Sequence, residues 1–174
     1  KQKAITEIPE YETLSHFGAL NENADLDAII EANRICNEAG MDTITAASSI
    51  ACLAEIREER YTGPLLVDMV RRTAESSGDG ALLKLGSAEL ARRLGAPEKS
   101  MSVKSLELPA YDPRGAYGMA LAYGTSTRGG CHLRASPISH EILRKPVATD
   151  RFSFSGKARI IKISEDLNAV IDSI

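Results

Sequence analysis

Apolar residues recur at spacings of three and four along the first half of the chain, which is the period of an α-helix with one buried face. The pattern predicts helices over residues 25–40, 43–60, 65–76 and 79–94. Asp25 stands before the first of them as an N-cap, and Gly40 follows it as a stop signal. Asp42 or Thr43 can cap the second helix. This half of the chain is therefore expected to be a group of short helices.

The second half of the chain is less regular. Pro97, Pro109 and Pro113 exclude a regular helix over 96–114, because proline removes a backbone donor and restricts the residue before it. We expect this segment to run extended. The pattern further predicts helices over 115–123 and 164–174 and a short strand pair over 150–162. Aromatic residues make up only 5% of the chain, which suits helical packing better than a β-sandwich. The predicted fold class is mainly α and multihelical.

Length, charge and cysteine content exclude several classes of protein. A chain of 174 residues has the size of one domain, so a single core is the default. The net charge is -3 and the 21 Lys and Arg residues are scattered, which argues against a nucleic-acid partner. No apolar run approaches the roughly 18 residues that span a bilayer, and the start lacks the apolar middle of a signal peptide. The odd number of cysteines argues against a disulfide framework. We expect a soluble, cytoplasmic protein without a membrane partner.

Two long stretches carry a resemblance to a known family. They are IPEYETLSHFGALNENADLDAIIEANRICNEAGMDTITAASSIA and KSLELPAYDPRGAYGMALAYGTSTRGGCHLRA. Both closely resemble the second and third domains of the tungsten-containing aldehyde ferredoxin oxidoreductase family. The resemblance implies that residues 1–174 are a fragment holding domain 2 and the start of domain 3. The amino-terminal sheet domain and the four cluster cysteines, in a CxxCxxxC run and a DxxGLC motif, would then lie outside the chain, whose ends look cut.

The resemblance also implies cofactors and partners. The whole enzyme of this family holds tungsten, or molybdenum, between two pterins beside a four-iron four-sulfur (4Fe-4S) cluster. It oxidises an aldehyde to a carboxylic acid and passes the electrons to ferredoxin. The fragment alone is expected to be inactive, to bind neither metal centre tightly, and to dock the missing domains of the same chain; a homodimer stays open. The alternatives are a family paralogue that reduces carboxylic acids or aromatic rings, and a stand-alone helical binding module without metal.

Two residues in the resembling motifs are predicted to be catalytic. Glu12 of PEYET falls where the family has a glutamate close to tungsten, and it would accept a proton. His132 of RGGCH falls where the family has a histidine near the metal, and it would hydrogen-bond an oxo ligand or the substrate carbonyl. Gly129 and Gly130 would let the backbone turn tightly beside the cofactor. The alternatives are a solvated glutamate and an ordinary loop histidine. If the assignment holds, Glu12 and His132 face one concave region.

Cofactor contacts are predicted at four further residues, and no residue is assigned as a metal ligand. Asn37 and Asp42 lie in NEAGMDT, which resembles a pterin motif of the family, with Asn37 standing where the family usually has Asp. Asp172 is the matching acceptor of the second motif. Arg128 is predicted to contact pterin phosphate or an acidic substrate. Arg134 is a weaker candidate of the same kind, and either arginine could instead pair with a nearby carboxylate.

The remaining polar residues of these motifs are predicted to be structural. His16 and His140 are expected in surface loops, and Glu31 on the surface of the helix that follows Asp25. Cys131 is expected to be a small buried residue. In DPRG, Asp112 before Pro113 should make a turn and cap the helix that follows.

Overall fold

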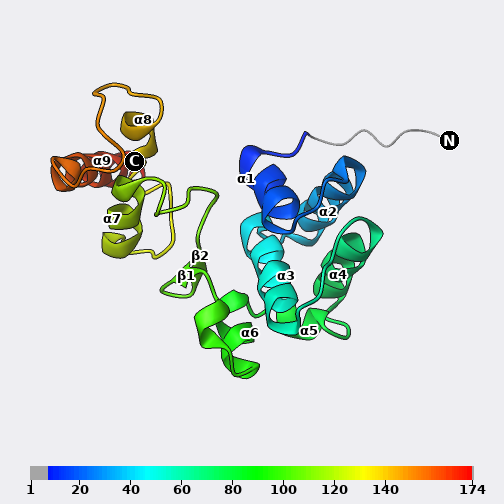
Figure 1. The fold of residues 1–174 in the computed structure, drawn as a ribbon. Coiled ribbons are helices and arrows are strands. Elements are labelled where there is room, and N and C mark those ends of the chain that lie inside the picture. The colour runs from blue at the N-terminus through cyan, green and yellow to red at the C-terminus, as the bar shows by residue number, and fades with distance from the viewer. Residues whose placement is uncertain (1–7, 174) are drawn as a thin grey trace. The chain divides into compact units, whose positions relative to one another are not determined.

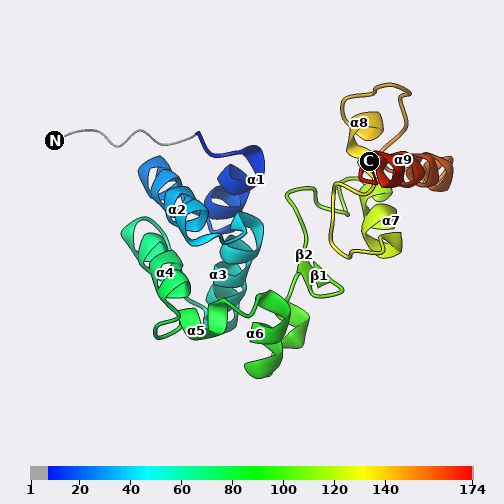
Figure 2. The same ribbon diagram turned by 180° about the vertical axis from the view of Figure 1, so that it is seen from behind.

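The computed structural model describes residues 8–173, which divide into two compact units. Unit 1 ends at Met101 and unit 2 begins at Ser102. Each unit has hydrophobic clusters of its own. The single core that length alone suggests is therefore wrong, while the predicted mainly α, multihelical fold class is confirmed (Figures 1 and 2).

Unit 1 is a group of helices around one core. Its elements are α1 (Tyr11–Leu14), the π-helical segment η1 (Ser15–Leu20), α2 (Leu26–Ala39), α3 (Thr43–Arg57), α4 (Pro64–Glu75), α5 (Gly80–Leu83), α6 (Ser87–Arg93) and the 3-10 turn η2 (Pro97–Lys99). The central helix α3 packs against η1 on one side and α6 on another, and α2 packs mainly against α4. Phe17, Ile50 and Leu53 are fully buried between these helices.

The helices predicted in unit 1 are present, with their predicted caps, up to residue 75. The Asp25 side chain accepts a hydrogen bond from the Ala28 N–H (3.1 Å), and Asp42 rather than Thr43 caps α3. The single helix predicted over 79–94 is wrong, because α5 and α6 are separate. Gly86 stands between them with φ 82°, a conformation that a right-handed helix does not contain.

Unit 2 contains a small hairpin and three helices. The hairpin pairs β1 (Ser102–Val103) with β2 (Leu106–Glu107), antiparallel. It is followed by α7 (Tyr117–Thr125), the short α8 (Ile138–Glu141) and α9 (Lys157–Ile171). The strand pair predicted over 150–162 is wrong, since α9 starts at Lys157 and the pair of strands lies earlier in the chain.

A buried ion pair explains why α9 begins where it does. Lys157 Nζ donates to Glu141 Oε1 (2.5 Å), and the side chains are 2% and 0% exposed. The Gly118 N–H of α7 donates to the same oxygen (2.8 Å). These three residues connect all three helices of unit 2 through one carboxylate. Of the described helices, none is both long enough and apolar enough to cross a membrane.

Candidate functional site

Glu12 lies on α1 with little access to solvent. Its side chain is 12% exposed. The neighbouring Thr13 hydroxyl donates to the Thr43 hydroxyl (2.9 Å), and Thr43 begins α3 directly after Asp42. Unit 1 therefore joins the PEYET segment to the NEAGMDT segment, although some thirty residues separate them in sequence. The expectation of a freely solvated glutamate does not describe Glu12.

His16 was missed by the sequence prediction, which placed it in a surface loop. It is buried, at 3% exposure, in η1. Its Nδ1 lies 2.7 Å from the Glu12 carbonyl oxygen and 3.6 Å from Glu12 Oε2. The signal that could have found it is the spacing of four residues, which puts two helical side chains on one face.

The π-helical segment gives His16 a fixed position. A π-turn leaves backbone carbonyls that the regular helical pattern would use, and such turns occur often at functional sites. Here the buried Asn21 amide donates to the carbonyl oxygens of His16 (2.7 Å) and Ala47 (3.1 Å). The Asn23 amide donates to the Phe17 carbonyl (3.2 Å). Buried amide side chains thus fix this segment to α3.

Asn37 lies in the last turn of α2 and Asp42 caps the start of α3, and both are exposed. Asp42 Oδ2 accepts the Thr45 N–H (2.7 Å), and the carboxylate is exposed. A pterin presents N–H groups, so acceptors with free lone pairs fit its edge. Burial, with a smaller contribution from the Asp42 charge, raises the pKa of the neighbouring Cys36 thiol to about 12. The Asp42 carboxylate therefore lies at the surface, while the Cys36 thiol is buried.

His132 lies in unit 2 and is partly exposed. Its ring is tilted by 48° against the Tyr111 ring, with centroids 5.8 Å apart. The preceding glycines pack against the hairpin. A Cβ at Gly129 would lie 2.3 Å from the Val103 carbonyl oxygen, and one at Gly130 would lie 2.5 Å from the Leu106 carbonyl oxygen. The hairpin alone thus requires both glycines, and their approach to a cofactor stays a prediction.

The arginines of this loop have partners inside unit 2. Arg134 forms an ion pair with Asp172 (Nη1 to Oδ2, 2.8 Å), so two residues predicted to meet the cofactor contact each other. Arg128 is exposed, and its Nη1 lies 3.8 Å from the Cys131 sulfur. Cys131 is buried, as predicted.

The other structural predictions have mixed outcomes. Asp112 makes the predicted turn, because its side chain accepts the Arg114 N–H (2.8 Å), and the Arg114 guanidinium lowers the pKa of the Asp112 carboxyl. Asp112 does not cap α7, whose N-cap is Ala116. Glu31 is the predicted surface residue and pairs with Arg34. His140 is in the short helix α8 rather than in a loop.

The predicted site residues are divided between the two units. Glu12, Asn37 and Asp42 belong to unit 1, and His132, Arg128 and Asp172 belong to unit 2. A common site for Glu12 and His132 therefore stays a prediction. Among residues 8–173 there is no cluster of three His, Cys, Asp or Glu side chains that could hold a metal ion.

Comparison with known proteins establishes the family. A sequence profile described as "Aldehyde ferredoxin oxidoreductase, domains 2 & 3" matches residues 1–174. The chain belongs to the aldehyde ferredoxin oxidoreductase family. It is 41% identical to the tungsten-containing aldehyde ferredoxin oxidoreductases of Pyrococcus furiosus and of Thermococcus kodakarensis. The alignments cover 97% of the chain but 30% and 31% of the relatives, so the chain spans about a third of their length. The resemblance predicted from the motifs is confirmed.

Proposed function

We propose that this chain is the pterin-binding part of an aldehyde ferredoxin oxidoreductase, comprising domain 2 and part of domain 3. The complete enzyme would carry a tungsten bis-pterin and a 4Fe-4S cluster, act in the cytoplasm, and reduce ferredoxin. The names of the relatives support tungsten, aldehyde and ferredoxin. One structural observation carries the proposal for this chain. The Glu12 carboxylate is 12% exposed, and the Thr13–Thr43 hydrogen bond holds its helix against the turn that presents Asp42.

The reaction adds the oxygen of water to the carbonyl carbon of an aldehyde, forming the acid with release of two protons and two electrons. The tungsten–pterin group, when bound, would supply the acceptor for both electrons. Glu12 takes the proton that water loses as its oxygen bonds to carbon, since a carboxylate within reach of the attacking water is a general base. His132 donates a hydrogen bond to the carbonyl oxygen, which stabilises the negative charge that forms there.

The other predicted residues would hold the cofactor. Asp42 and the Asn37 amide oxygen would accept hydrogen bonds from the N–H groups of one pterin, and Asp172 would do the same for the second. Arg128 would offer a cation to a pterin phosphate. Asp42 is suited to this role because its carboxylate is exposed and fixed in position by capping α3.

The test is substitution of Glu12 in the complete enzyme. Glu12→Gln keeps shape and hydrogen bonding but removes the base, so aldehyde turnover should fall by about 10²-fold or more with tungsten content unchanged. Glu10→Gln is the matched control, because Glu10 belongs to the same motif and is exposed. His132→Asn should also lower turnover without loss of metal. Unchanged activity in Glu12→Gln, or loss of tungsten together with activity, would contradict the assigned role.

Measurements on the complete wild-type protein distinguish the proposed function from the two alternative functions. A binding module would contain no tungsten at all. A family paralogue would contain tungsten but act on a carboxylic acid or an aromatic ring rather than on an aldehyde. Metal analysis followed by an aldehyde assay distinguishes the three cases.

A further inference from the structure

Positive charge gathers on one segment of unit 2. Residues 142–162 contain six Lys and Arg residues and one acidic residue, Asp150, in a chain whose net charge is -3. Two of the cations are neutralised, Lys157 by Glu141 and Lys162 by Asp166. The other four have no carboxylate partner within residues 8–173; they are Arg144, Lys145, Arg151 and Arg159. The even scatter of cations expected from the sequence overlooks this group.

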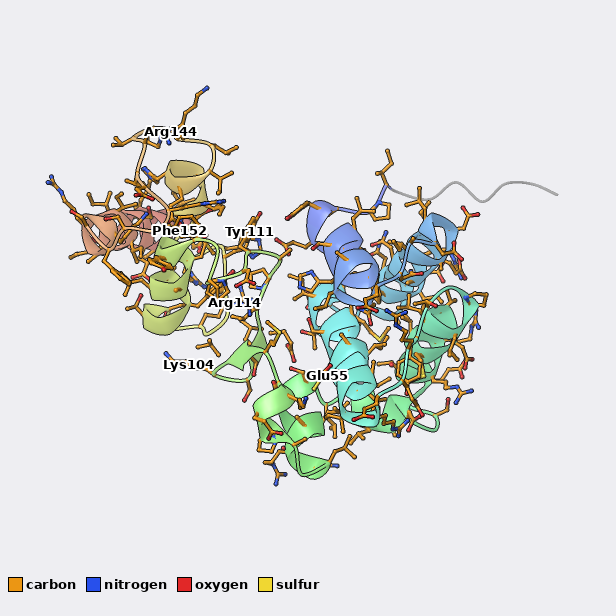
Figure 3. The ribbon with its side chains drawn as sticks, viewed as in Figure 1. Glu55, Lys104, Tyr111, Arg114, Arg144 and Phe152 are labelled. Atoms are coloured by element: carbon orange, nitrogen blue, oxygen red, sulfur yellow. The ribbon has the colours of Figure 1, made fainter. Side chains whose placement is uncertain are left out.

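Two of these cations share a shallow depression between α8 and the start of α9. Arg144 and Arg151 line it together with the apolar side chains of Ile142 and Phe152. Asp150 also lines the depression and is the one exposed carboxylate there. Glu141, the other carboxylate of the lining, is buried and paired with Lys157. Figure 3 shows Arg144 at the outer end of the loop between the two helices. Arg144 has φ 60°, a strained conformation for a residue with a side chain, and such residues cluster at functional sites.

Three further apolar side chains of the same segment are exposed to solvent. Leu143 is 69% exposed, Val147 61% and Phe154 81%. Phe154 has a fixed position even so, because it stacks on Tyr117 of α7 with ring centroids 4.9 Å apart and an angle of 21°. The Arg151 guanidinium lies 4.6 Å from the centre of the Phe152 ring. Aromatic and arginine side chains held in place in this way are the usual anchors of protein–protein interfaces.

We propose that this surface docks an acidic protein that accepts the electrons, that is, ferredoxin. The α8–α9 surface, as we call it, consists of Leu143, Arg144, Lys145, Val147, Arg151 and Phe154. The choice of occupant rests on charge. Unpaired cations around an apolar centre match a partner with carboxylates around an apolar patch, and opposite charges speed the encounter of transient redox partners. Nucleic acid fits less well, because the cations form no stripe along which a phosphate backbone could run. The proposal rests on the proposed function.

The test compares two electron acceptors in the complete enzyme. The double variant Arg144→Glu/Arg151→Glu should raise the KM for an acidic ferredoxin by about tenfold. The rate of aldehyde oxidation with methyl viologen as the electron acceptor should stay unchanged, because this small dye needs no docking surface. Raising the salt concentration should weaken ferredoxin reduction in the wild type and much less in the variant. Arg144→Lys/Arg151→Lys keeps both charges and should retain most of the ferredoxin activity.

The control variant makes the same change in charge on a different surface of the protein. Arg71→Glu/Lys84→Glu reverses two exposed cations of unit 1 and should leave the KM for ferredoxin within about twofold of the wild type, because only local charge steers docking. The proposal is overturned by an unchanged KM in the double variant, or by an equal rise in the control. It is also overturned by a parallel loss of dye activity, which would mean that the surface packs against the rest of the polypeptide. Binding of anionic lipid vesicles in place of ferredoxin would overturn it as well.

If the proposed function is wrong, the assays give a different result from the one expected if only the docking surface is wrong. If the wild type oxidises no aldehyde with either acceptor, the function is wrong while docking can still be measured. Calorimetry then measures the direct binding of ferredoxin to the wild type and to the double variant, and this comparison tests the docking surface. Binding that the double variant loses supports the docking surface, and equal binding by both proteins refutes it.

Discussion

Lys157→Met should destabilise unit 2 strongly, because it leaves a carboxylate buried without its cation. The Lys157 and Glu141 side chains are 2% and 0% exposed, and Nζ lies 2.5 Å from Oε1. Methionine fills a similar volume, so the main loss is the charge. Removing one partner of a buried ion pair costs about 3–5 kcal/mol, whereas neutralising both partners is often nearly neutral. We therefore expect a loss of about 3–5 kcal/mol for Lys157→Met and a large recovery in Lys157→Met/Glu141→Gln, where the amide oxygen can still accept the Gly118 N–H.

The assay must report on unit 2 separately. Hydrogen exchange at the Gly118 amide does so, since this N–H donates to the same Glu141 oxygen (2.8 Å). Urea unfolding followed by circular dichroism gives the free energy. Lys162→Met is the matched control on the same helix, because its pair with Asp166 is largely exposed to solvent and should contribute little to stability. If Lys157→Met costs no more than Lys162→Met, the ion pair does not hold the helices of unit 2 together.

Two further predictions concern unit 1. Arg57 lowers the pKa of the Asp79 carboxyl, so this pair should stabilise the fold above the ordinary pKa of about 3.9 and lose its effect as the pH falls through the lower folded value. Asp79→Asn should then cost about 1 kcal/mol or less at neutral pH and weaken the acid dependence of unfolding, while unaltered acid dependence would refute this account. The Cys36 thiol, with its pKa raised to about 12 mainly by burial, should react with iodoacetamide only when unit 1 unfolds. Rapid alkylation of the native protein at neutral pH would contradict its burial, and Cys36→Ser offers the control for labelling elsewhere.

The local signals in the sequence were sufficient to predict a helix where that helix has one apolar face and a capping residue at its start. Asp25, Asp42 and Gly40 act as predicted, because a cap is a contact between residues three or four apart and needs no tertiary structure. The family was also predictable, since PEYET and RGGCHLR are continuous stretches. The same signals failed over 150–162, where the start of α9 depends on a carboxylate supplied by another helix.

The tertiary structure decided what lies next to these motifs. Burial of His16 beside Glu12 requires the π-turn and the amide of Asn21, which contacts α3. The pairing of Arg134 with Asp172 joins residues that are 38 positions apart. The group of unpaired cations on the α8–α9 surface likewise depends on which carboxylates fold against which bases. Sequence spacing fixes neighbours along one helix, but contacts between elements depend on how the apolar faces pack, and that is determined only when the chain folds.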